Sequence, residues 1–190
     1  VISDSFATRD LVRDMASAVH FYAVVITRDM ARLIEASNDR VVAEFQPEDD
    51  KQNNMENIPF PIDNNGLYMT SDGGSDRSSN NESSHLKEFF NQVDKSVQEL
   101  WGEHKLPLVI VGDAKNIGYY KEVCDRPDNI IATVSNVTNL DDGSAQHIID
   151  SVQESVEEYR SSLHTEAMGE IDKARGASML QTDLQEVYRS

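Results

Sequence analysis

Three neighbouring runs decide the fold: HFYAVVIT (20–27), MARLIEA (30–36) and VVAEF (41–45). Each is rich in β-branched, aromatic or other apolar residues, which is typical of strands. Only Arg28-Asp29 and the turn-forming residues 37–40 separate them. Because a parallel return needs a long crossover, these short connections predict three antiparallel strands.

The second half of the chain alternates strands with helices. The apolar runs LPLVIV (106–111) and NIIATV (129–134) predict buried strands, and a short helix is expected between them over 114–124. A long helix is expected from Ser144 through Leu163. The strongest periodic stripe precedes these elements and predicts a helix with Ser83-Ser84 as its cap: Leu86, Phe89, Phe90, Val93, Val97, Leu100 and Trp101.

With a further helix expected over 7–19, the order is α, then β-β-β-α-β-α-β-α. This order predicts an α/β fold in which helices cover the faces of one mixed sheet. We expect five strands, three antiparallel plus two parallel. This is the connectivity of ribonuclease H-like domains.

Composition and charge narrow the classes of partner and the cellular location that the sequence allows. The 190 residues carry 34 Asp and Glu against 17 Lys and Arg, a formal charge of −17. A protein that binds free nucleic acid needs clustered cations, so the charge argues against free nucleic-acid binding. No apolar run approaches the length of a membrane span. The start lacks a basic leader, which predicts a cytoplasmic protein.

The segment 46–82 is the most polar part of the chain. Its eight acids against two bases (Lys51 and Arg77) give it a net charge of −6. Such a segment buries too little area to offset its ordering entropy, so we expect a mobile acidic loop. Two apolar islands within it, 60–62 and 67–69, are expected to dock on the body of the protein.

Familiar catalytic arrangements are weakly represented. Asp113, after the strand over 106–111, is the one carboxylate placed where a Mg²⁺ nuclease would need it. The first strand, where the central metal ligand should stand, has no acid. A helix cap is therefore the favoured role of Asp113. Gly112-Asp113 lacks the glycine spacing of a phosphate loop. Cys124 is expected to be buried and inert. The five histidines show no metal-binding spacing, so neither a metal nor a cofactor is expected: His20, His85, His104, His147 and His164.

Four stretches in matching order resemble the middle domain of the bacterial relatives of archaeo-eukaryotic class-1 release factors, a group also similar to Pelota-type ribosome rescue factors. They are FYAVVITRDMARLIEASNDRVVAEF (21–45), HLKEFFNQVDKSVQELW (85–101), PLVIVGDAKNIGYYKEVC (107–124) and IIATVSNVTNLDDGSAQHIIDSVQESV (130–156). The resemblance implies a middle domain over 20–166, the end of a preceding domain or an N-terminal helix over 1–19, and a linker with the start of a C-terminal domain over 167–190. The first helix of that C-terminal domain is expected over 182–189.

The resemblance also implies a functional loop. In true release factors a Gly-Gly-Gln loop before the long helix enters the peptidyl-transferase centre, where the glutamine helps water attack the peptidyl-tRNA ester. The matching residues here are Gly73, Gly74 and Ser75, followed by Asp76. Serine cannot present the glutamine amide, and acids beside the loop would repel RNA phosphate by roughly 1 kcal/mol per close pair. Both departures argue against hydrolysis.

Three hypotheses follow. The first is a translation-associated protein that acts at the ribosome or on peptidyl-tRNA. The second is a non-enzymatic module whose acidic surface binds a basic protein partner. The third is a degenerate ribonuclease H-like nuclease that would use Asp113.

Overall fold

The computed structural model describes residues 18–46, 60–64, 79–101 and 105–176. The chain divides into two compact units, Val1–Val156 and Glu157–Ser190. The first contains the whole sheet, and the second contains the later turns of the last helix. The helix expected over 7–19 falls mostly outside the described residues, and Ala18 and Val19 lead into the first strand without regular structure.

The three antiparallel strands predicted from the sequence are confirmed. They are β1 (His20–Ile26), β2 (Met30–Ser37) and β3 (Arg40–Glu44). β1 pairs with β2 along its whole length, and β2 pairs with β3 through an irregularity at Glu35/Ala36. The β2–β3 turn contains Asn38 with a φ of 53°, a left-handed conformation that asparagine tolerates.

Two parallel strands complete the predicted sheet. β5 (Leu108–Gly112) pairs with β1, and β6 (Ile130–Val134) pairs with β5, so the order is β3-β2-β1-β5-β6. The structure adds a sixth strand that the sequence does not reveal, the two-residue β4 (Ile62–Asp63), which pairs antiparallel with β2. The mixed α/β sheet with helices on its faces is confirmed and is consistent with a ribonuclease H-like fold.

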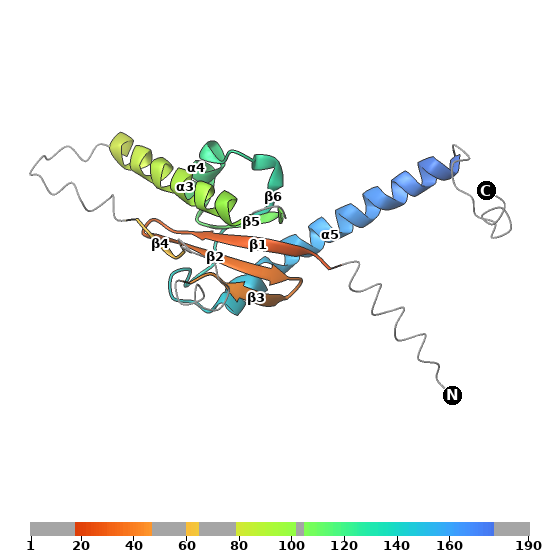
Figure 1. Ribbon diagram of the computed structural model, residues 1–190, viewed down its shortest axis with the longest axis horizontal. Helices are drawn as coiled ribbons and strands as arrows, with labels where there is room; N and C mark the ends of the chain where they lie inside the picture. The colour runs from red at the N-terminus through yellow and green to blue at the C-terminus, as the bar shows by residue number, and fades with distance from the viewer. Residues whose placement is uncertain (1–17, 47–59, 65–78, 102–104, 177–190) are drawn as a thin grey trace, which may run out of the picture. The chain divides into compact units, whose positions relative to one another are not determined.

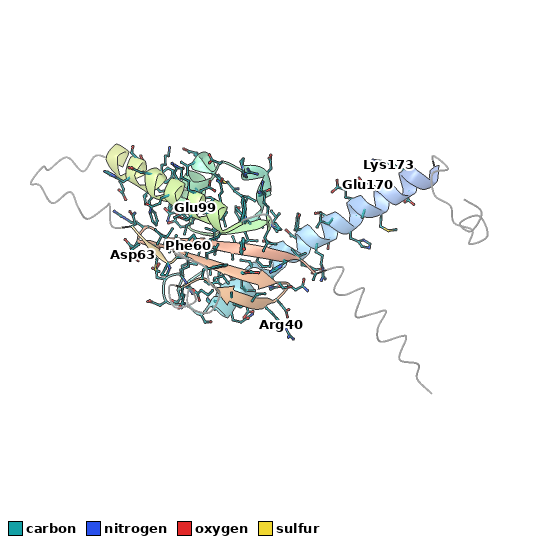
Figure 2. All side chains as sticks on the ribbon, in the orientation of Figure 1. Arg40, Phe60, Asp63, Glu99, Glu170 and Lys173 are labelled. Carbon is teal, nitrogen blue, oxygen red and sulfur yellow. The ribbon has the colours of Figure 1, made fainter. Side chains whose placement is uncertain are left out.

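Two helices cover one face of this sheet (Figure 1). They are α3 (Ser79–Trp101) and α4 (Ala114–Val123). The apolar stripe of α3 packs on alternate residues of the strands, such as Val24 and Leu108, in one continuous core. Phe60 and Ile62 belong to the same core and are 0% and 7% exposed, so the docking predicted for the island 60–62 is confirmed. In Figure 2 Phe60 lies at the sheet beside α3, and Asp63 lies at its edge.

The first turns of α5 (Ala145–Gly176) cover the opposite face (Figure 1). Their buried residues are Ile148, Ile149, Val152 and Val156. Two glutamines fix this part of the helix to the β2–β3 turn. The side-chain amide of Gln153 donates to the Asn38 carbonyl at 3.0 Å, and that of Gln146 donates to the Asp39 carbonyl at 2.7 Å.

The bounds of three segments differ from the predictions. α3 begins at Ser79, so Ser83 and Ser84 lie inside its first turns rather than capping it. α5 continues past Leu163 and through Gly169 to Gly176. The loop expected over 46–82 is interrupted by β4, while the island 67–69 and the helix over 182–189 lie outside the described residues. The domain boundaries stay predictions.

Candidate functional site

The predicted loop residues Gly73, Gly74, Ser75 and Asp76 lie outside the described residues. The structure does describe the residues on both sides of them. On one side is β4 with Asn64, and on the other is α3. The candidate site is therefore built from these two flanks and from the element that contacts both.

That element is the turn between β1 and β2. The backbone N–H of Asn64 donates to the Asp29 carbonyl at 2.7 Å, and the side-chain amide of Asn64 donates to the Arg28 carbonyl at 2.8 Å. The guanidinium of Arg28 forms an ion pair with Glu82 of α3 at 3.1 Å. One two-residue turn thus contacts the chain both before and after the predicted loop. We call Arg28, Asp29 and Asn64 the turn anchor.

Asp113 is a helix cap, as the sequence favours. Its carboxylate accepts hydrogen bonds from the backbone N–H groups of Lys115 at 2.8 Å and Asn116 at 3.0 Å, which satisfies two otherwise unpaired donors at the start of α4. No group of three or more histidine, cysteine or acidic side chains suited to a metal ion occurs in the described parts of the chain. Asp113 therefore belongs to no such group among the described residues.

Two of the described histidines, His20 and His147, contact nearby protein groups. His20 pairs with Glu35 across the β1–β2 ladder at 2.7 Å. The exposed ring of His147 lies 3.3 Å from the Thr138 carbonyl at the start of α5. His85 lies in α3, the exposed His164 lies in α5, and His104 lies outside the described residues.

A buried polar cluster between α3 and α4 was not predicted. Asp94 is 1% exposed, yet it lies within the apolar stripe of α3. Its carboxylate accepts from the Tyr120 hydroxyl at 3.1 Å, from the Gln98 amide at 2.6 Å and from the Asp125 backbone N–H at 3.2 Å. The sequence signal was an acid next to Val93, at a position where the helical period calls for an apolar residue.

Burial and this carboxylate determine the acidity of two neighbours. Burial, followed by the charge of Asp94, raises the pKa of Tyr120 well above its ordinary value. Burial is also the largest effect on Cys124, and a hydrogen bond to Asp94 adds to it, so the thiol pKa rises to about 12. Cys124 is only partly buried, less than expected, but a thiol with this pKa is almost wholly protonated near pH 7 and is a poor nucleophile.

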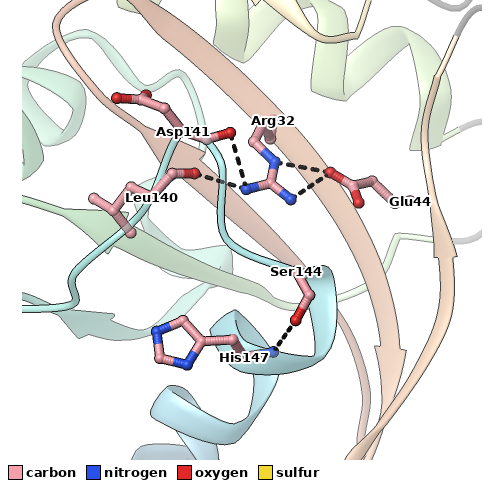
Figure 3. A network of polar contacts seen from close by, with 6 residues as sticks. All are labelled: Arg32, Glu44, Leu140, Asp141, Ser144 and His147. Carbon is pink, nitrogen blue, oxygen red and sulfur yellow. Dashed lines mark hydrogen bonds and ion pairs between the residues drawn. The ribbon is translucent and has the colours of Figure 1, made fainter.

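A second unpredicted network is centred on Arg32, which is 6% exposed (Figure 3). Its guanidinium donates to Glu44 of β3 at 2.8 Å and to the Leu140 carbonyl at 2.7 Å. It therefore joins two strands to the loop before α5. These contacts hold the edge of the sheet against that loop.

Comparison with known proteins gives one family and no curated relative. No helix among the described residues is long and apolar enough to cross a membrane. No curated protein matches the chain. The model of the bacterial archaeo-eukaryotic release factor family 3 matches residues 20–190. This range begins at β1 and includes every described helix and strand. The chain therefore belongs to the bacterial archaeo-eukaryotic release factor family 3.

Proposed function

We propose that this protein acts in translation by associating with the ribosome, and that residues 73–76 face peptidyl-tRNA there without hydrolysing it. Membership of a release-factor family supports a translation-related role. The observation that carries the proposal is the match over residues 20–190, which includes the Gly73-Gly74 pair and both of its described flanks.

The chemistry of the loop sequence supports the second half of the proposal. Ser75 stands at the place of the glutamine, and its short side chain cannot present the amide that a glutamine offers to the ester oxygen and to water. Two other groups offer no substitute. The Cys124 thiol is kept protonated by a pKa of about 12, and the Asp113 carboxylate already accepts two backbone N–H groups.

Ribosome association is tested by co-sedimentation of the full-length protein at increasing salt. We expect the protein to pellet with ribosomes at low salt and to be released as salt increases, because ion pairs between the protein and the ribosome weaken with ionic strength. A sample lacking ribosomes controls for self-aggregation. Failure to pellet with ribosomes at any salt concentration would exclude the proposal.

Hydrolysis is tested with ribosome-bound peptidyl-tRNA. We expect the protein to release no more peptide than buffer does. The matched variant replaces Gly73 and Gly74 by alanine. Release by the natural sequence that disappears in this variant would show an active loop and would contradict the non-hydrolytic part of the proposal.

The charge favours a second candidate, a non-enzymatic module that binds a basic protein. The chain has 34 acidic residues against 17 basic ones, and this surplus of negative charge would attract such a partner electrostatically. A pull-down settles the choice. A salt-sensitive basic protein retained after nuclease treatment, with no ribosomes captured, would favour this candidate over the first.

A further inference from the structure

We infer that the exposed side of α4 is the surface through which this protein meets the phosphate backbone of ribosomal RNA. Lys115 and Lys121 supply the positive charges beside the ring of Tyr119, and we call these three residues the α4 face. The inference rests on the proposed function, because it names the part of the molecule that makes the ribosome contact.

Charge is distributed unevenly between the two faces of the sheet. Residues 105–126, which include β5 and α4, carry four bases against three acids, whereas residues 127–156, which include β6 and the first turns of α5, carry five acids and no lysine or arginine. The four bases are Lys105, Lys115, Lys121 and Arg126, and the five acids are Asp128, Asp141, Asp142, Asp150 and Glu154. α4 and the first turns of α5 lie on opposite faces of the sheet (Figure 1). A polyanion therefore meets less repulsion at α4 than at the first turns of α5.

The three acids of residues 105–126 already have protein partners. The Asp113 carboxylate accepts two backbone N–H groups at the start of α4. Glu122 forms an ion pair with Lys87 of α3 at 2.5 Å, and the Asp125 carboxylate accepts from the Gln98 amide at 3.4 Å. These contacts leave the three carboxylates less able to neutralise the lysines of the α4 face.

The two lysines of the α4 face are available to an anion from outside. Both are exposed, and no acidic side chain among the described residues forms an ion pair with either of them. The Lys115 ammonium lies 5.8 Å from the centre of the Tyr119 ring, and the Lys87 ammonium lies 5.3 Å from it. Attraction to an aromatic ring restricts the positions of an ammonium, so Lys115 loses less freedom when it binds phosphate.

The neighbouring helix limits the contact to α4. On α3 the exposed Lys95 lies between the exposed Glu88 and Glu99, so acids outnumber bases on that stretch. The contact therefore involves few phosphates. This agrees with a chain whose formal charge of −17 argues against binding free nucleic acid.

Ribosome co-sedimentation of charge variants of the full-length protein tests the inference. Lys115→Gln combined with Lys121→Gln is the test variant, and Arg40→Gln combined with Lys173→Gln is the matched control. Both change the formal charge by two, from −17 to −19, but Arg40 lies in β3 and Lys173 lies in α5 (Figure 2). Near 0.1 M salt the test variant is expected to bind ribosomes about fivefold more weakly, and the control is expected to change less than about twofold.

The salt dependence gives a second readout of the same variants. The plot of log affinity against log salt concentration is expected to be less steep by about 1.5 in the test variant, the contribution of two phosphate contacts. Lys115→Arg combined with Lys121→Arg keeps both charges and is expected to bind as the natural protein does. Because the replaced side chains are exposed, melting temperatures are expected to stay unchanged in all variants.

The possible outcomes separate this inference from the proposed function. If the natural protein pellets with ribosomes and the test variant binds equally well, the inference alone is overturned. An equal loss of affinity in the test variant and the control would show a general effect of net charge and would also overturn it. If the natural protein does not pellet, the proposed function and the inference fail together.

Directed hydroxyl-radical cleavage identifies the class of partner. An iron chelate is attached to Gly118→Cys, an exposed α4 position with open space for a side chain, or to Glu154→Cys in the first turns of α5, each in a Cys124→Ser background. Cleavage of ribosomal RNA is expected from position 118 and not from position 154. Binding that requires Lys115 and Lys121 without RNA cleavage from position 118 would indicate an acidic protein partner and would overturn the assignment to RNA.

Discussion

At the scale of single residues, the least expected feature is a carboxylate inside the apolar face of a helix. Asp94 is stabilised by three donors, from Tyr120, Gln98 and the Asp125 backbone. Buried polar groups are tolerated when they are hydrogen-bonded in this way. The cluster ties the end of α4 to the middle of α3.

This cluster predicts a loss of stability at alkaline pH. In the unfolded chain the Cys124 thiol and the Tyr120 hydroxyl lose their protons near pH 9 and pH 10, while in the folded protein both pKa values are raised. Above these pH values the unfolded state binds fewer protons than the folded state. The contribution of the two groups to the free energy of unfolding is therefore complete below about pH 9 and is lost as the pH rises toward 12.

Urea unfolding at several pH values measures this effect. The midpoint is expected to fall steadily above about pH 9, and the fall is expected to be shallower in Tyr120→Phe, which has no hydroxyl to titrate. Tyr119→Phe on the same helix is the matched control and is expected to follow the natural protein. A midpoint that stays constant from pH 8 to pH 11 would contradict the assignment.

At the scale of elements, the contact between β1 and β5 depends on a glycine. A Cβ atom at Gly112 would lie 2.6 Å from the Ile26 carbonyl oxygen and 2.9 Å from its side chain. The neighbouring backbone cannot move away without disturbing the parallel pairing of Ile26 with Gly112. In contrast, a Cβ atom at Gly118 in α4 would meet nothing within 4 Å.

The pair gives opposite predictions for the same chemical change. Gly112→Ala is expected to lower the free energy of unfolding by about 1–3 kcal/mol through overpacking. Gly118→Ala is expected to raise it by roughly 0.5–1 kcal/mol, because alanine favours a helix interior. Denaturant titration of both variants checks the signs. A Gly112→Ala variant as stable as the natural protein would show that β1 and β5 can move apart enough to accept a methyl group at no cost.

The elements also show how far sequence patterns reach. Strands β1, β2 and β3 were predictable because long apolar runs and short turns allow one arrangement. β4 was not, because two residues carry no period, and it forms only because Phe60 and Ile62 fill the core beside β2. The length of α5 was underestimated because Gly169 is a weak helix former that its helical neighbours tolerate.

The candidate site was predicted unevenly for similar reasons. The cap role of Asp113 follows from a local rule, and the structure confirms it. Asn64 and Asp94 act through residues distant in sequence, Arg28 and Tyr120, so no local pattern marks them. The loop itself, Gly73–Asp76, was identified only by resemblance and stays a prediction.

At the scale of the whole molecule, an excess of negative charge acts against compactness. The formal charge is −17 and the calculated isoelectric point is about 4.5. Many described acids are exposed, including Glu99 on α3 and Glu170 on α5 (Figure 2). Like charges crowded on a folded surface repel one another more than they do on an unfolded chain.

Salt is therefore expected to stabilise the protein. Raising sodium chloride from about 0.01 M to about 0.1 M shortens the screening length from about 30 Å to about 10 Å. We expect this change to raise the melting temperature measured by calorimetry by a few degrees near pH 7.5. Potassium chloride at equal ionic strength is the control for specific ion binding. A melting temperature that falls with salt would show that attractive ion pairs outweigh the repulsion.

Trp101 gives this protein a built-in optical reporter. It is the only tryptophan in the chain, it ends α3, and it is 4% exposed within the core shared by α3 and the sheet. Its fluorescence therefore follows the unfolding of the first compact unit alone, whereas far-ultraviolet circular dichroism also detects the turns of α5 beyond Glu157. Recording both signals in one titration separates melting of the distal helix from melting of the sheet without any labelling.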